Sequence, residues 1–473
     1  MGRNRQPRNR TVVAALVLLA VAVCAGAAAP ARAAVPVKSI WWNVLGPTTA
    51  DDRWVDVARG PDGSLYAAGD FAFDPFGTTT DVMVAKFSAD DAAASHLLQS
   101  DEIDVSSQNV SDLAQAMAVD GSGALIVVGT TQTATGSAWF VAKWNPDLTG
   151  RPWTKLFAAS PLQQWNADAW DVACTPAGDV VVCGTTQTAE STSKGVPASL
   201  VVRKLSGATG DVIWKNGYAG PKGSYNQGTA VALDAAGNVY CTGYGTNAKG
   251  DSDILVAKFR GSDGSRRWVR RIDGPRHRAD EAADIAVRGT AVYVTGGEYV
   301  NARTRDAVVA RYTATGRRPW VRTWREKAGT VEYPAALTTD GRGNVVVVGE
   351  GVNVPIVTRE HAFVLKYSGA GLQRWRRIAY DSVSHMAAWD DVLCDSVGDI
   401  WTGGHMVVAG SASYLMARYS PTGAKVWSSQ WKGFDGLGGD CAALCFANGG
   451  VFTAGKITTT AGGGDAAAIK YER

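Results

Sequence analysis

The chain has 473 residues, with 47 Lys and Arg against 44 Asp and Glu, which gives a formal net charge of +3. So small an excess does not indicate a nucleic-acid-binding protein. The composition, 46% hydrophobic and 19% charged, is that of an ordered globular protein, and its 54 glycines and 17 tryptophans indicate many short strands joined by tight turns.

The N-terminal segment has the pattern of a secretory signal. Four arginines fall within the first ten residues, an apolar run follows at 12–29, and Ala31-Arg32-Ala33 supplies a small-residue cleavage site. We predict a signal peptide at 1–33, cleaved before Ala34, and a single extracellular domain at 34–473. An uncleaved membrane anchor is the alternative, because the 18 residues of the apolar run could nearly span a bilayer. No later segment is apolar enough to do so.

A lone apolar strand, "SIWWNVLG" at Ser39–Gly46, comes next, and nothing like a repeat precedes it. The rest of the chain is an array of similar units. Each unit contains a turn, a valine-rich strand and a closing glycine, as in "GNVYCTG" and "GNVVVVG". Eight such glycines recur 51 to 60 residues apart, at Gly69, Gly129, Gly184, Gly243, Gly296, Gly349, Gly404 and Gly455.

Every unit has the same order of four short strands. Strand A is rich in Ala and Val, strand B is the valine-rich run, strand C carries a basic residue near its end, and strand D usually contains a tryptophan. This pattern predicts an all-β fold, an eight-bladed β-propeller of four-stranded blades. A helical solenoid is excluded because no unit shows a 3.6-residue apolar period.

The last unit ends with its strand C, "DAAAIKYER", and lacks a strand D. The lone strand at Ser39–Gly46 has the strand D character that this unit lacks. We therefore expect the N-terminal strand to complete the last blade and close the ring, so that no unpaired strand edge is left open.

These units resemble the bacterial β-propeller repeat family called SBBP, whose pattern appears here as "AVALDAAGNVYCTGYG…DILVAKF…GSRRW". The resemblance covers essentially Trp41 to Tyr471 and implies a repeat type rather than an activity. That family's name implies seven blades, whereas eight units are present. "KYSGAGLQRW" and "RYSPTGAKVW" also resemble the tryptophan-docking repeat of quinoproteins. Those enzymes carry adjacent cysteines near the cofactor, and no two cysteines are adjacent here, so pyrroloquinoline quinone is not favoured.

Two series recur at one place in each unit. The strand D tryptophans could be stacking platforms for a ligand, but their recurrence favours packing between blades; they are Trp153, Trp214, Trp268, Trp320, Trp375 and Trp427. The strand C basic residues could form a cationic ring, but a bond to the turn of the neighbouring blade is favoured; they are Lys86, Lys143, Lys204, Lys258, Arg311, Lys366, Arg418 and Lys470.

A third series alternates between units. Strand A carries an aspartate in the odd-numbered units, at Asp56, Asp171, Asp284 and Asp391, where the even-numbered units have Ala116, Ala230, Ala336 and Ala442. Strand A lines the channel of a propeller, so the four carboxylates could attract a cation such as calcium. The alternative, which we favour, is that each aspartate accepts backbone N–H groups of the next blade.

The variable loops, B–C and D–A, leave from one face of such a fold, and binding residues concentrate on loops held by a rigid scaffold. We call this the long-loop face, and take it as the site of a ligand or partner. Topology alone places these residues there: Trp165, Asp168, Arg276, His277, Glu281, Glu332, Tyr333, His385 and Asp390.

Catalytic motifs are not apparent in the sequence. None of the five histidines has metal-ligand spacing with another, and no nucleophile elbow, P-loop or calcium loop occurs. Cys174 and Cys183 fall on one predicted hairpin and could bridge, with buried free thiols as the alternative.

We therefore expect an exported, monomeric binding or scaffold protein whose partner is a protein or glycan at the cell surface. A secreted hydrolase or lyase acting on polysaccharide is the alternative, and binding of a quinone-like cofactor is the third.

Overall fold

A computed structural model describes residues 39–45, 52–71, 79–90, 96–105, 110–134, 136–158, 166–187, 197–221, 223–247, 249–301, 303–327, 329–353, 360–379, 385–408, 411–431, 438–458 and 464–472. These residues form 32 strands, and no helix occurs among them. The predicted signal peptide at 1–33 lies outside this part of the chain.

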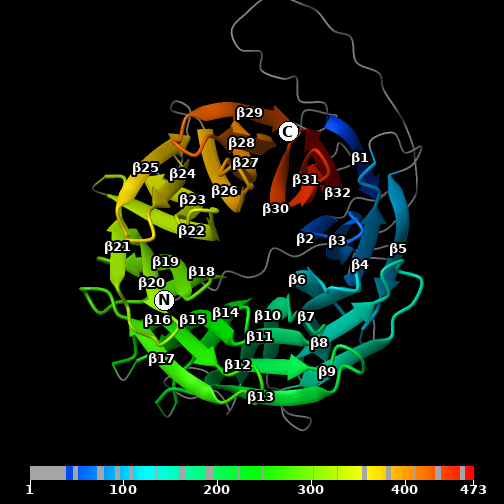
Figure 1. Ribbon diagram of the computed structural model, residues 1–473, viewed down its shortest axis with the longest axis horizontal. Coiled ribbons are helices and arrows are strands. Elements are labelled where there is room, and N and C mark those ends of the chain that lie inside the picture. The colour runs from blue at the N-terminus through cyan, green and yellow to red at the C-terminus, as the bar shows by residue number, and fades with distance from the viewer. Residues whose placement is uncertain are drawn as a thin grey trace, which may run out of the picture.

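The strands form antiparallel sheets in which consecutive strands are neighbours, and Figure 1 shows the sheets arranged around a central opening. The fold is a β-propeller. Four consecutive sheets come from the first half of the chain: β2 (Arg53–Arg59), β3 (Leu65–Phe71), β4 (Asp81–Phe87) and β5 (Leu97–Ile103); β6 (Asp112–Val119), β7 (Leu125–Thr133), β8 (Gly136–Trp144) and β9 (Trp153–Ala158); β10 (Ala167–Cys174), β11 (Val180–Gln187), β12 (Ala198–Leu205) and β13 (Val212–Tyr218); and β14 (Asn226–Leu233), β15 (Val239–Thr246), β16 (Ser252–Phe259) and β17 (Arg266–Ile272).

The second half repeats this plan. Eight strands belong to one sheet, in which two antiparallel meanders meet at a single parallel pairing of Arg305 with Val331. They are β18 (Asp280–Arg288), β19 (Ala291–Tyr299), β20 (Arg305–Thr313) and β21 (Trp320–Trp324), then β22 (Thr330–Thr339), β23 (Val345–Asn353), β24 (Glu360–Tyr367) and β25 (Gln373–Ala379). A further four-stranded sheet contains β26 (His385–Cys394), β27 (Ile400–Val408), β28 (Ser411–Tyr419) and β29 (Lys425–Trp431).

The last sheet combines the two ends of the described chain. Its order is β1 (Ser39–Leu45), β32 (Gly464–Glu472), β31 (Gly450–Thr458) and β30 (Gly439–Ala447). β1 pairs antiparallel with β32, with Trp42 opposite Ile469 and Leu45 opposite Ala466. The pairing predicted for the N-terminal strand is therefore present. This sheet also packs on the first one, because Phe452 and Ala466 share a hydrophobic cluster with Trp54 and Phe87.

The closing glycines of strand B have a steric cause. The first strand of each sheet has a β-bulge opposite the glycine, for example between Trp54 and Asp56 opposite Gly69. A Cβ atom on Gly69 would lie 2.0 Å from the carbonyl oxygen of Arg53, and one on Gly243 would lie 1.8 Å from that of Gln227. Since such contacts are impossible, the bulge requires glycine, and this requirement produces the repeat seen in the sequence.

Neighbouring sheets are joined at the turn between their third and fourth strands. Trp153 donates its indole N–H, and Lys143 its ammonium, to the carbonyl of Gly207 in the next sheet, at 3.2 and 2.8 Å. The same pairing recurs around the fold, for example from Trp214 and Lys204 to Gly261. The last sheet contacts the first in the same way, since Lys470 donates to the carbonyl of Ala89 at 3.0 Å. The prediction that the two series serve packing between blades is confirmed for most of their members; Arg418 differs, since it bonds to Asp399 of its own sheet.

Candidate functional site

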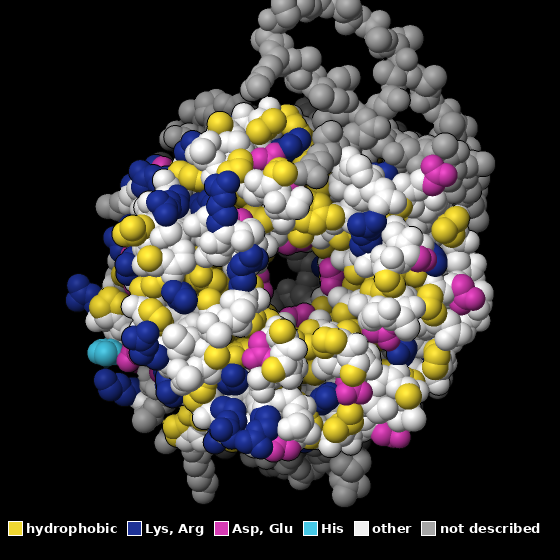
Figure 2. Space-filling view, in the orientation of Figure 1, with side chains coloured by type: hydrophobic (Ala, Val, Ile, Leu, Met, Phe, Trp, Pro, Cys, Tyr) yellow, Lys and Arg dark blue, Asp and Glu magenta, His cyan; other side chains and the backbone are white. Residues whose placement is uncertain are grey.

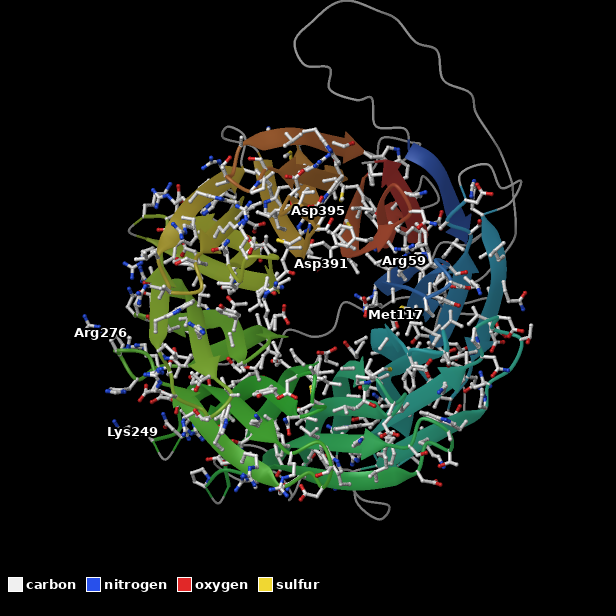
Figure 3. All side chains as sticks on the ribbon, in the orientation of Figure 1. Arg59, Met117, Lys249, Arg276, Asp391 and Asp395 are labelled. Atoms are coloured by element: carbon white, nitrogen blue, oxygen red, sulfur yellow. The ribbon has the colours of Figure 1, made fainter. Side chains whose placement is uncertain are left out.

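The four predicted aspartates lie on the innermost strands, and Figure 3 places Asp391 beside the central opening. Each accepts two backbone hydrogen bonds. One oxygen of Asp171 accepts the N–H of Val172 at 2.7 Å, and the other accepts that of Val231, in the next sheet, also at 2.7 Å. The other three bond in the same way to the residue that follows them and to the next four-stranded meander: Asp56 to Met117, Asp284 to Leu337 and Asp391 to Leu444.

Both oxygens of each carboxylate are therefore used by the fold, which confirms the structural alternative. A calcium ion needs six to eight free oxygen ligands, and these residues do not fit it. One detail of the predicted series is wrong: the bulge in β30 makes Ala443, not Ala442, the equivalent of the aspartates, since Ala443 is opposite Ala454. Each aspartate thus joins its own four-stranded meander to the one that follows it.

Burial raises the pKa of Asp56 and Asp284 to about 7 and that of Asp171 to about 8, against the lowering by the backbone hydrogen bonds. The pKa of Asp391 is raised for the same reason. These side chains are half-buried by exposed area because they line the central opening, but the surrounding strands crowd this opening, so desolvation remains the largest influence on their pKa. Asp284 and Asp56 add to the rise in the pKa of Asp171, because like charges face one another around the opening.

We expect Asp171→Asn to lower the free energy of unfolding at about pH 5 by about 1–3 kcal/mol, because an amide nitrogen cannot accept the N–H of Val231. The carboxyl group keeps its proton to about pH 8 in the folded protein but only to about pH 4 when unfolded. The contribution of Asp171 to stability therefore falls as pH rises between these values. Since asparagine does not titrate, the difference between the two proteins should shrink with rising pH. Urea unfolding at about pH 5 and pH 8.5 measures it, and a difference that grows would contradict this account.

Two of the residues predicted on the long-loop face lie in the loop before β18. His277, which has a left-handed backbone with φ of 51°, contacts Asp273 at 2.7 Å between its Nδ1 and the carboxylate. Arg276 is exposed and lines a cleft. Trp165 lies outside the described residues. The backbone of His385 begins β26, opposite Val408, and the position of its side chain is not described.

Asp390 accepts a hydrogen bond from Nδ1 of His405 at 3.0 Å. Burial alone would lower the pKa of His405, but the hydrogen bond and charge of Asp390, together with Asp440 and Glu350, raise it to about 9. The imidazole is therefore a cation at neutral pH, held in an ion pair. In this state it has no free lone pair with which to act as a general base.

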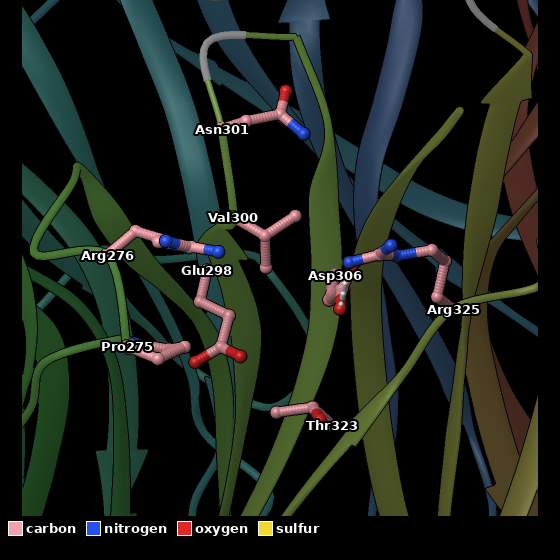
Figure 4. A pocket seen from close by; sticks show the side chains of 8 residues that line it. All are labelled: Pro275, Arg276, Glu298, Val300, Asn301, Asp306, Thr323 and Arg325. Atoms are coloured by element: carbon pink, nitrogen blue, oxygen red, sulfur yellow. Dashed lines mark hydrogen bonds and ion pairs between the residues drawn. The ribbon is translucent and has the colours of Figure 1, made fainter. Parts of the chain in front are cut away.

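A cleft of about 470 Å³ lies at the ends of β19 and β21, and Figure 4 shows the side chains that line it. They include Arg276, Glu298, Asp306, Thr323 and Arg325. Asp306 accepts two hydrogen bonds from Arg325, at 2.6 and 2.9 Å, in a bidentate ion pair. Of the residues predicted from sequence, only Arg276 lines this cleft, so it combines one predicted residue with acids that the sequence did not indicate.

Charge is distributed unevenly over the surface. Figure 2 shows acidic side chains at the rim of the central opening and Lys and Arg gathered over the left side of the view, where Figure 1 places β17, β21 and β25. Several of these arginines bond to the backbone of the next sheet, as Arg270 does to Gly316 and Arg322 to Gly371.

One cluster has the composition of a metal site. The carboxylates of Asp81, Asp104 and Asp112 come within 4.8 Å of one another, and Asp112 also accepts the N–H of Val105 at 2.6 Å. In two later sheets the equivalents of Asp81 face an arginine instead, in the pairs Asp253–Arg271 and Asp306–Arg325.

The six cysteines in the described part of the chain are free thiols, so of the two possibilities for Cys174 and Cys183 the free thiols are present. Cys174 is opposite Val180 and Cys183 is opposite Asp171, so the two cysteines are three residues apart along the hairpin, which is too far for a disulfide.

Within the described part of the chain, no helix is long and apolar enough to cross a membrane.

No protein-family model and no curated protein matches the chain. Among solved structures, it is similar to Chaetomium thermophilum Sqt1 bound to the N-terminus of ribosomal protein L10, at 12% identity over 91% of this chain and 98% of that one, with a TM-score of 0.53. It is also similar to a europium-containing methanol dehydrogenase (10% identity, 92% and 93% covered, TM-score 0.49) and to BamB from Moraxella catarrhalis (14%, 83% and 88%, 0.41). At these identities the likeness concerns the fold alone.

Proposed function

We propose that this chain is an exported, monomeric, eight-bladed propeller of the SBBP type that binds a protein partner through its long-loop face. The single observation that carries the proposal is how the recurrent polar residues are used. Five of the strand D tryptophans, seven of the eight strand C bases and the four channel aspartates bond to the next four-stranded meander. The ring is thus a rigid support, and the residues that differ between units are on the loops, where binding residues concentrate.

Two further points support this proposal. The N-terminal sequence has the pattern of a signal peptide, which favours export. Sqt1, of similar fold, is bound to a protein segment in its structure, so such a scaffold can present a peptide-binding surface. A glycan partner and hydrolysis of polysaccharide are outcomes that the experiment below would detect.

Site-specific photo-crosslinking tests the face that binds. A photoreactive amino acid at Arg276 or Arg303, exposed in the loops before β18 and β20, should cross-link the exported chain to a partner in the culture from which it is secreted. The same group at Thr209 or Ala236, exposed in turns of the opposite face, should not. Equal cross-linking from both faces would contradict the proposal.

The purified chain should also be tested by thermal unfolding with calcium, pyrroloquinoline quinone and neutral and anionic glycans. A ligand at 100 times its dissociation constant would stabilise the chain by about 2.7 kcal/mol. A shift with a glycan alone would favour the polysaccharide alternative over a protein partner.

A further inference from the structure

Three carboxylates stand side by side at one end of the sheet formed by β18, β19 and β20. Asp280 is opposite Glu298, and Glu298 is opposite Asp306, so all three occupy neighbouring positions on one face. The two outer members have partners. Asp280 accepts the N–H groups of Gly274 and Tyr299, at 2.6 and 3.1 Å, and Asp306 holds Arg325.

The central member has none. Glu298 is only 5% exposed, and among the described residues its carboxylate has no hydrogen bond and no ion pair. Its side chain projects into the cleft of about 470 Å³, below Arg276 and above Thr323 in Figure 4. A carboxylate in so buried a position is costly unless it has a partner. Since no described residue pairs with Glu298, its carboxylate is satisfied from the cleft, by water or by a ligand.

The repeat itself shows that the fold does not need an acid here. The register makes Gly245 and Gly351 the equivalents of Glu298 in the two adjacent meanders, since they are opposite Asp253 and His361. A Cβ atom on Gly245 would lie 2.2 Å from the amide oxygen of Asn226, and one on Gly351 would lie 2.3 Å from the imidazole of His361. In those two places a neighbouring side chain occupies the space that the side chain of Glu298 takes here.

We propose that this cleft binds a ligand through an alkylammonium group, which pairs with the carboxylate of Glu298. Three carboxylates, those of Asp280, Glu298 and Asp306, stand against two guanidinium groups, those of Arg276 and Arg325, and Arg325 is already held by Asp306, so negative charge is in excess here. An ammonium is a compact cation with three donors, and Glu298 offers the two unoccupied acceptor oxygens. Burial, with the charges of Asp280 and Asp306, raises the pKa of Glu298 to about 7 against the lowering by Arg325, which a bound cation would reverse.

Calcium fits this arrangement poorly. The oxygens of Asp280 are occupied by backbone N–H groups and those of Asp306 by Arg325, so one carboxylate remains where calcium needs six to eight oxygens. An anion is repelled by Glu298. Arg276, which has no hydrogen bond or ion pair with any described residue, lines the same cleft and can hold an acidic group at the other end of a zwitterionic ligand.

The inference deepens the proposed function, on which it rests only for placing a ligand on the long-loop face. Isothermal titration calorimetry of the purified chain with cadaverine, 6-aminohexanoate and hexanoate tests it. Both amines should bind one to one and hexanoate should not. Glu298→Gln should weaken binding of the amines at least tenfold, whereas Glu102→Gln should not, because Glu102 is exposed on β5, in another sheet and outside the lining of the cleft.

The Arg276→Ala variant distinguishes two classes of ligand that carry an ammonium group. A loss of affinity for 6-aminohexanoate alone identifies a zwitterion, and unchanged affinity for both probes identifies a simple amine; both outcomes support the proposal. Binding of hexanoate as tight as that of the amines, competition by calcium, or an unchanged affinity in Glu298→Gln would overturn it. Thermal unfolding of each variant shows that it is folded. Absence of amine binding while cross-links from Arg303 persist would refute this inference and leave the proposed function standing.

Discussion

Deletion of β1, Ser39–Leu45, is expected to destabilise the protein more than any single substitution considered above. β1 forms the outer strand of the last sheet, where the structure pairs five of its residues with β32. At about 1 kcal/mol for each paired residue, the free energy of unfolding should fall by roughly 3–5 kcal/mol. The edge of β32 would then be unpaired, and such edges promote association between chains. Thermal unfolding and light scattering of the truncated chain measure both effects.

Two proline variants provide a matched control for the deletion. Asn43 and Val44 are adjacent, opposite Ala468 and Ala467. In an antiparallel edge strand only alternate N–H groups point to the partner strand, and proline lacks this group. One of Asn43→Pro and Val44→Pro should therefore be much more destabilising than the other. Equal effects, or a deletion that leaves the unfolding temperature unchanged, would show that β1 does not hold the last sheet together.

Alanine at Gly316 is the second large effect that we expect. Gly316 has φ of 81°, and a Cβ atom there would lie 2.8 Å from the ring of Trp268 in the preceding sheet. Left-handed backbone costs a residue other than glycine about 1–2 kcal/mol, and forcing a methyl group against a packed ring adds about 1–3 kcal/mol. The total loss should be roughly 2–5 kcal/mol, measured as the change in free energy of unfolding in urea.

Gly343 separates these two contributions. Its φ of 78° is nearly the same, but nothing lies within 4 Å of a Cβ atom built on it. Gly343→Ala should therefore cost only the backbone part, about 1–2 kcal/mol. In the background of Trp268→Leu, Gly316→Ala should cost no more than Gly343→Ala. If the two alanine variants were equally stable in the unaltered protein, docking of the turn on Trp268 would not contribute to the joint between sheets.

The candidate site was less accessible to prediction than the fold. The sequence shows that strand A alternates between aspartate and alanine, but the N–H groups that occupy the carboxylates belong to residues such as Val231, 60 positions after Asp171. Asp390 was predicted on the long-loop face together with His385, yet the structure pairs it with His405 on the neighbouring strand. Glu298 gives one sequence signal, a carboxylate where the adjacent units have Gly245 and Gly351. This difference from the adjacent units can be interpreted only once the strand register is known.

The sequence by itself determined the repeating sheet of four strands and the pairing of β1 with the end of the chain. It did so because each joint between sheets imposes similar local requirements along the repeat: a glycine opposite a bulge, a base near the end of the third strand and, in most units, a tryptophan at a turn. Tertiary structure alone decided which charged groups are satisfied. Asp280, Glu298 and Asp306 are 18 and 8 residues apart in the chain. Only the register of three strands, with a guanidinium for one acid and two amide groups for another, leaves Glu298 without a partner among the described residues.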